Sequence, residues 1–97
     1  MSIARLYRMT APEGGGDALK AALEGLAAQV RPIPGCQGVE LLQDVDALHC
    51  FTFIEKWDSV DAHKAGSTHL SKEALKPVMG ALAGPPEGAY LTYLLGV

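Results

Sequence analysis

The chain has 97 residues and a formal net charge of −3, and its eight Lys and Arg do not cluster. This length predicts one domain over residues 1–97, and the charge argues against a nucleic-acid or anionic membrane partner. Cys36 and Cys50 are too few for a disulfide scaffold, and no run of about 20 apolar residues exists to span a bilayer. Residues 1–10 lack the apolar core of a signal peptide, so we expect a reduced, cytoplasmic protein.

The first part of the chain predicts a strand, a helix and a second strand. Residues 2–10 place successive side chains on alternate faces, as in a strand. A turn rich in Gly follows, and from residue 18 to 31 apolar side chains recur at steps of three and four, which predicts an amphipathic helix. Prolines end that helix, and residues 36–44 predict the second strand, with a hairpin turn after it.

Residues 48–57 predict the central strand, and this strand is apolar on both faces. Phe51, Phe53 and Trp57 share one face with His49 and Glu55. A Leu, a Cys and an Ile occupy the opposite face. A half-exposed strand would show one polar face, so both faces must be covered by something.

The last part of the chain predicts a short helix, a longer helix and a final strand. Residues 60–65 form one or two helical turns, and Ser67 or Thr68 is expected to cap a helix that Pro77 kinks or divides. Residues 89–97 predict an almost wholly apolar strand.

The predicted order βαββαβ is that of a ferredoxin-like α+β fold, with a four-stranded antiparallel sheet and its helices on one face. The other sheet face would be bare and yet apolar, which is unusual in a monomer. We therefore expect a homodimer in which two copies pack sheet against sheet around a two-fold axis.

A set of short motifs gives the chain a family likeness. They are Glu55-x-Trp57, Ala62-His63, Ser67-x-His69 and the run Ala81-Leu82-Ala83-Gly84-Pro85-Pro86 before a last strand that carries Tyr. This pattern resembles the antibiotic biosynthesis monooxygenase family, dimeric α+β barrel proteins that include quinol monooxygenases. The resemblance implies one pocket per subunit, between the sheet and its own helices. It also implies an oxidoreductase that uses no metal, flavin or haem: a dihydroxy-aromatic substrate is deprotonated and gives an electron directly to O₂.

The resemblance and the residue chemistry together suggest roles for five side chains. Trp57 and Phe53 would hold an aromatic ring, and Glu55 would orient a histidine or form a salt bridge. His63 would remove a phenolic proton, because imidazole titrates near neutral pH, and His69 would be auxiliary. The alternatives are a surface role for either histidine and a purely structural role for Trp57.

Two arginines on the first strand and the tyrosines are further polar residues with an expected role. Arg5 or Arg8 could stabilise an oxyanion, and the tyrosines suit a sheet by propensity. No spacing of His, Cys or carboxylates indicates a metal, and no glycine loop has phosphate-binding form. We expect a cofactor-independent monooxygenase acting on a small quinol or polyphenol. The alternatives are a non-catalytic binding barrel, and an isomerase or lyase that uses His63 for carbon-acid chemistry without oxygen.

Overall fold

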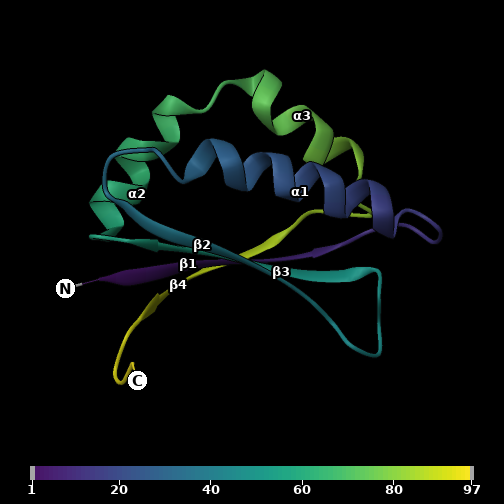
Figure 1. Cartoon of the computed structure of the whole chain (residues 1–97), viewed down its shortest axis with the longest axis horizontal. Coiled ribbons are helices and arrows are strands. Elements are labelled where there is room, and N and C mark those ends of the chain that lie inside the picture. The colour runs from purple at the N-terminus through teal and green to yellow at the C-terminus, as the bar shows by residue number, and fades with distance from the viewer. Residues whose placement is uncertain (1, 97) are drawn as a thin grey trace.

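The computed structural model describes residues 2–96, which form a four-stranded sheet covered on one face by helices (Figure 1). In chain order the elements are β1 (Ile3–Thr10), α1 (Gly16–Val30), β2 (Cys36–Gln43), β3 (Cys50–Trp57), α2 (Val60–Gly66), the 3₁₀ turn η1 (Ser67–His69), α3 (Lys72–Gly80) and β4 (Glu87–Thr92). This order confirms the predicted ferredoxin-like α+β fold.

The strand order is β2-β3-β1-β4, and β1 pairs antiparallel with both β3 and β4. Arg5 on β1 lies opposite Glu55 on β3 and opposite Tyr90 on β4, so these three residues form one row across the sheet. Side chains alternate along a strand, so this row points to the same face as Phe53 and Trp57. That face is the one under the helices, because both aromatic side chains are buried there.

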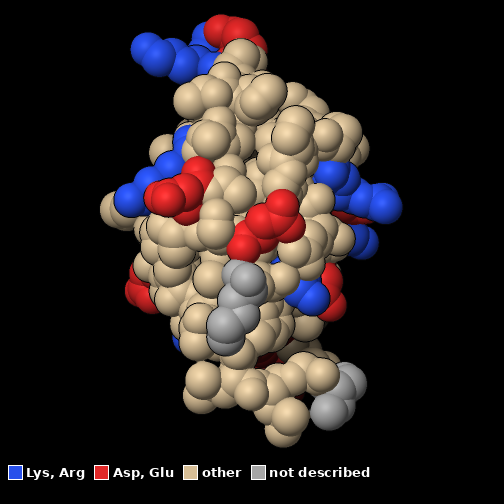
Figure 2. Space-filling view, turned by 90° about the vertical axis from the view of Figure 1, so that its left-hand side faces the viewer, with Lys and Arg blue, Asp and Glu red and all other residues tan. Residues whose placement is uncertain are grey.

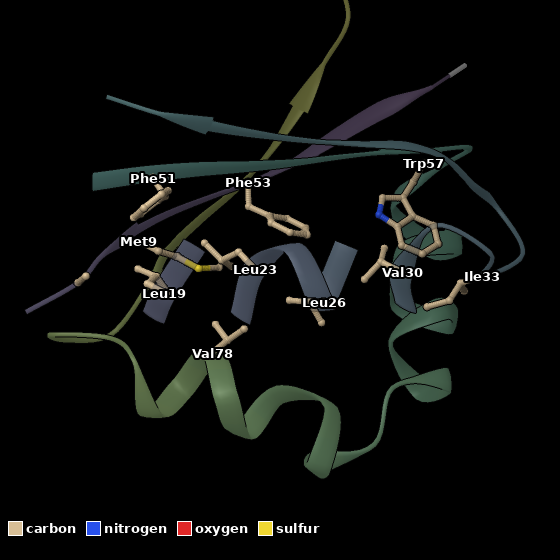
Figure 3. Packing of buried hydrophobic residues seen from close by; sticks show 11 residues of the cluster. Met9, Leu19, Leu23, Leu26, Val30, Ile33, Phe51, Phe53, Trp57 and Val78 are labelled. Atoms are coloured by element: carbon tan, nitrogen blue, oxygen red, sulfur yellow. The ribbon is translucent and has the colours of Figure 1, made fainter. Parts of the chain in front are cut away.

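The hydrophobic core lies between the helices and this face of the sheet (Figure 3). The buried stripe of α1 consists of Leu19, Leu23, Leu26 and Val30, at the three- and four-residue steps expected for an amphipathic helix. Phe51, Phe53 and Trp57 of β3 and Val78 of α3 pack against it. Each fully buried side chain of this size contributes about 1.5–3 kcal/mol of hydrophobic free energy.

The second half of the chain departs from expectation at two places. Helix α3 begins later than expected, because its cap is Ser71 rather than Ser67 or Thr68. The Ser71 hydroxyl accepts a hydrogen bond of 3.2 Å from the amide of Ala74. Ser67 instead begins the 3₁₀ turn η1. The helix α3 runs through Pro77 without being divided. The last strand was expected over residues 89–97, but β4 ends at Thr92, which pairs with Ile3, the first residue of β1. Residue 97 lies outside the described residues.

The face of the sheet opposite the helices carries apolar side chains at the surface. Leu6 and Ile54, which lie opposite each other on β1 and β3, are half-buried, and Leu42 and Leu91 are 49% and 46% exposed. Figure 2 views the molecule from the end where α2 and the start of β1 lie, and acidic and basic side chains are interspersed there without a continuous basic patch. Across residues 2–96, no helix combines the length and the apolar character needed to cross a bilayer.

Candidate functional site

A pocket of about 240 Å³ lies between the sheet and the helices. Most of its wall is apolar and comes from Leu26 and Val30 of α1, Leu75, Val78 and Met79 of α3, and Leu82. The polar groups on the wall are Tyr7, Glu55, the indole N–H of Trp57, His63 and Ser67. Two wider hollows lie at the other end of the β1–β3 pair, and Thr10, Gln43 and Ala83 line both of them. Neither hollow is lined by Tyr7, Glu55 or His63. A small apolar pocket with a few converging polar groups is the usual form of a ligand site.

Helix α2 places His63 against the end of β3. Ser59 caps the helix, because its hydroxyl accepts a hydrogen bond from the amide of Ala62 at 3.0 Å. The helix packs so closely on Trp57 that a Cβ added at Gly66 would lie 2.6 Å from the indole ring. The rings of His63 and Trp57 meet edge to face, with centroids 5.5 Å apart. The imidazole is therefore held at a fixed place on the pocket wall.

Both ring nitrogens of His63 contact tyrosine hydroxyls. Nε2 lies 3.2 Å from the hydroxyl of Tyr7, and Nδ1 lies 2.7 Å from the hydroxyl of Tyr90. A neutral imidazole has one N–H donor and one acceptor, so one tyrosine donates to the ring and the other accepts from it. Burial lowers the pKa of His63 below its usual value, and the positive charges of Arg5 and Lys64 act in the same direction. This lowering of the pKa favours the neutral form of the His63 imidazole.

Glu55 is a buried carboxyl group, only 5% exposed, in the same cluster. The indole N–H of Trp57 donates a hydrogen bond of 2.8 Å to its Oε1, and the same oxygen lies 3.7 Å from His63 Nε2. Burial raises the pKa of Glu55, while the Trp57 hydrogen bond and the charge of Arg5 oppose that rise. Glu55 therefore fixes the orientation of the indole and lies beside the pocket-side nitrogen of His63.

The guanidinium of Arg5 places a positive charge next to the rings of Tyr7 and Tyr90. Its guanidinium carbon lies 4.8 Å from the ring centre of Tyr7 and 4.2 Å from that of Tyr90, so the cation lies against both rings. A Cβ on Gly88 would be 2.7 Å from Arg5 Nη2, so glycine leaves the space that the guanidinium occupies. Among the described residues, the buried Arg5 Nε has no hydrogen-bond partner. Burial is the main cause that raises the pKa of Tyr7, followed by Glu55, and Arg5 opposes it.

The structure brings together some of the side chains singled out from the sequence. His63, Trp57 and Glu55 meet on the pocket wall. Phe53 is fully buried in the core on the same sheet face and does not line the pocket. His69 is exposed in η1 and also lies outside the lining. Roles in ring binding for Phe53 and in catalysis for His69 stay predictions.

Sequence reasoning did not single out Tyr7 and Tyr90, which it treated as sheet formers. Tyr7 alternates with Arg5 on the same face of β1, and that signal was available in the sequence. Tyr90 joins the group only through the register of β4 against β1, which the sequence does not specify. Of the two candidate arginines, Arg5 joins the group, and Arg8 is exposed on the opposite face.

No group of three or more His, Cys, Asp or Glu side chains able to hold a metal ion is found within residues 2–96. Both cysteines are free thiols. Imidazole, carboxyl and phenol groups such as those on the pocket wall are chemically able to act as general acids, general bases or charge-stabilising groups.

Comparison with known sequences finds a matching family profile. The sequence profile of the family described as "Antibiotic biosynthesis monooxygenase" matches residues 2–76. No curated protein matches the sequence at a significant level.

Several solved structures share the fold. A family protein from Bordetella bronchiseptica has a TM-score of 0.86 and 22% identity, with 97% of this chain and 98% of that chain covered. One from Chloroflexus aurantiacus has a TM-score of 0.81 and 26% identity, with 100% and 97% covered. A variant of SnoaB, a cofactor-independent oxygenase from Streptomyces nogalater, has a TM-score of 0.83 and 17% identity, with 99% and 96% covered.

Proposed function

Because the chain belongs to the antibiotic biosynthesis monooxygenase family, we propose that it is a cofactor-independent monooxygenase that oxidises a small quinol or polyphenol with O₂. The observation that carries the proposal is an imidazole on the polar wall of an otherwise apolar pocket, with each ring nitrogen in contact with a tyrosine hydroxyl. SnoaB, which shares the fold, is a cofactor-independent oxygenase, and this likeness supports chemistry without a bound cofactor.

The pocket suits a ligand of one or two aromatic rings. Its volume of about 240 Å³ lies above the roughly 150 Å³ of a cavity that holds benzene. It lies below the range of about 300–1,000 Å³ typical of drug-sized ligands. Trp57 offers an aromatic wall, and Met79 and Leu82 supply an adaptable apolar surface opposite the polar groups.

In the proposed reaction, a phenolic hydroxyl of the substrate loses its proton, and His63 is the base that takes up the proton. The resulting phenolate is electron-rich and gives one electron to O₂, which forms superoxide and a substrate radical. The two radicals combine, so that a C–O bond forms. The peroxide is then protonated, and its O–O bond breaks as the ring carbon loses its hydrogen as a proton. One oxygen atom stays on that carbon as a quinone oxygen, and the other leaves as water. The positive charge of Arg5 favours the anionic states along this path, and the apolar wall excludes bulk water.

We also propose that the working unit is a homodimer. The apolar face with Leu42 and Leu91 is too extensive to suit an isolated small domain, and a second copy packed sheet against sheet would cover it. Two pockets, one per subunit, would then lie on the outer sides of the paired sheets.

The deciding experiment is O₂ uptake by metal-free protein given a panel of reduced quinols. His63→Ala is expected to lower kcat about 10²-fold, the usual contribution of a general base. His49→Gln is the matched control, because His49 is exposed and lies outside this pocket. Equal turnover in both variants would remove His63 from the mechanism.

Other outcomes of the same experiment point to the alternative functions. Ligand binding without O₂ uptake above autoxidation would favour a binding barrel. Conversion of a substrate under nitrogen would favour an isomerase or lyase that uses His63 on a carbon acid. His69→Gln tests the auxiliary role separately, since a fall in its kcat would require that exposed side chain to reach the substrate.

A further inference from the structure

The two nitrogens of His63 face different surroundings. Nε2 contacts Tyr7 and lies beside Glu55, and both of these residues line the pocket. Nδ1 contacts the hydroxyl of Tyr90, which does not line the pocket and belongs to a residue that is 38% exposed. The imidazole therefore lies between the pocket and the protein surface, with a hydroxyl group on each side.

We propose that Tyr90 is the solvent end of a proton relay that runs from the pocket through Tyr7 and His63. We call this series of groups the Tyr90 relay. The inference rests on the proposed function, because it assigns a path to the proton that the substrate must lose. It adds Tyr90, on strand β4, as a proton-transfer residue.

Each step of the Tyr90 relay moves one proton, and the two steps within the protein cross contacts of hydrogen-bond length. The substrate hydroxyl gives its proton to the Tyr7 oxygen, and the Tyr7 hydroxyl proton moves 3.2 Å to His63 Nε2. The Nδ1 proton then moves 2.7 Å to the Tyr90 oxygen, and the Tyr90 hydroxyl proton passes to water. The substrate is left as a phenolate, both tyrosines are neutral, and His63 carries its single ring proton on Nε2.

The second half of the reaction restores the starting state. Formation of water from the reduced oxygen needs protons, and one returns along the same path from Nε2 through Tyr7. Nδ1 then regains a proton from solvent through Tyr90. His63 ends in the tautomer with which it began, so the relay needs no separate step to reset the ring.

The surroundings of Tyr90 hold its hydroxyl in place for this role. Its ring lies edge to face with His63, with centroids 5.3 Å apart, and the guanidinium of Arg5 lies 4.2 Å from its centre. The charged and titratable groups around His63 are Arg5 and Tyr7 from β1, Glu55 from β3, Lys64 from its own helix, and Tyr90 from β4. The positive charges of Arg5 and Lys64 disfavour a lasting imidazolium, which suits a group that passes its proton on.

The test is Tyr90→Phe, which keeps the ring and removes only the hydroxyl. Tyr93→Phe is the matched control, because Tyr93 is also 38% exposed but its ring lies 5.1 Å from Lys56 Nζ on the opposite face. We expect kcat of Tyr90→Phe to fall about tenfold with KM unchanged. Adding millimolar imidazole buffer should restore much of that loss by carrying the proton instead, and should leave the wild type and Tyr93→Phe unaffected. A loss of kcat that buffer does not rescue would indicate a structural role and would overturn the relay.

A second readout does not depend on turnover. The nitrogen chemical shift of His63 Nδ1 should change in Tyr90→Phe and stay constant in Tyr93→Phe, because only the first variant loses the 2.7 Å contact. An unchanged shift would overturn the relay whatever the substrate is. Wild-type turnover with an unaltered kcat in Tyr90→Phe would refute the relay alone, whereas absence of O₂ uptake in every variant would refute the proposed function and the relay with it.

Discussion

Substitution of Gly66 by Ala adds one methyl group where helix α2 packs against Trp57 of the sheet. The new Cβ would lie 2.6 and 2.7 Å from two carbons of the Trp57 indole and 3.1 Å from Ile33 Cγ2. Carbon atoms normally approach to about 3.5–4.0 Å, so one side must move by about 1 Å. Trp57 is 2% exposed and fixed in the core, and its N–H is bonded to Glu55, so it cannot yield freely.

The magnitude follows from two opposing effects. Overpacking of a filled core costs about 1–3 kcal/mol. Alanine in place of glycine in a helix returns up to about 1 kcal/mol, and Gly66 has an ordinary helical φ of −63°, so no strain in the backbone adds to the balance. We expect a net loss of about 1–2 kcal/mol in the free energy of unfolding. For a domain of this length that loss lowers Tm by on the order of 10 °C.

Gly25→Ala is the matched control for this prediction. Gly25 lies inside α1 with no atom within 4 Å of an added Cβ, so the same substitution should stabilise the protein by about 0.5–1 kcal/mol. Thermal and urea unfolding followed by far-ultraviolet circular dichroism at equal protein concentration would measure both variants. A Gly66→Ala protein as stable as the wild type would refute the close packing of α2 on Trp57.

Three further predictions concern charge and assembly. Burial lowers the pKa of His63 below 6.5, so kcat should remain high just below pH 6.5 and fall only at more acidic pH. A pH–rate profile would measure this. A fall in kcat centred at or above pH 6.5 would contradict the burial of the imidazole. Burial raises the folded-state pKa of Glu55 above 4.5, so the charged carboxylate lowers the stability of the protein above that pH. Glu55→Gln should therefore have a higher Tm than the wild type at pH 7, and this difference should disappear below pH 4.5. A Tm difference between variant and wild type that is the same at both pH values would contradict this. Leu91→Asp places a charge on the apolar face of the sheet and should convert the proposed dimer to monomer in light scattering; a persistent dimer would exclude this face as the interface.

The strands and the amphipathic helix were predictable, because their apolar side chains recur with the period of a strand or a helix and so mark the face that is buried. The strands at residues 2–10 and 48–57 and the stripe of α1 all appear close to their expected bounds. The start of α3 was not predictable, because Ser67, Thr68 and Ser71 have similar capping ability and the sequence does not distinguish Ser71, which caps the helix. The apolar character of residues 93–96 suggested a longer last strand, but β1 begins at Ile3, whose partner on β4 is Thr92, so β1 offers no further partner.

Prediction of the site was partial for a related reason. Trp57, Glu55 and His63 are close in sequence, so a strand followed by a capped helix brings them together by local geometry. Phe53 lies on the same strand face as Trp57, but its side chain is fully buried in the core and is not among the residues that line the pocket. Tyr90 is 27 residues from His63, and only the pairing of β4 with β1 fixes its place.

The only tryptophan in the chain is also the wall of its pocket, and this gives the protein an intrinsic optical probe. The indole of Trp57 is buried, its N–H is bonded to Glu55, and its edge meets the ring of His63. Its fluorescence should therefore be blue-shifted, should be quenched when the neighbouring imidazole is protonated, and should change when an aromatic ligand enters. A single unlabelled emission spectrum thus reports core packing, the titration of the base and occupancy of the pocket, in the wild-type protein and without any added dye.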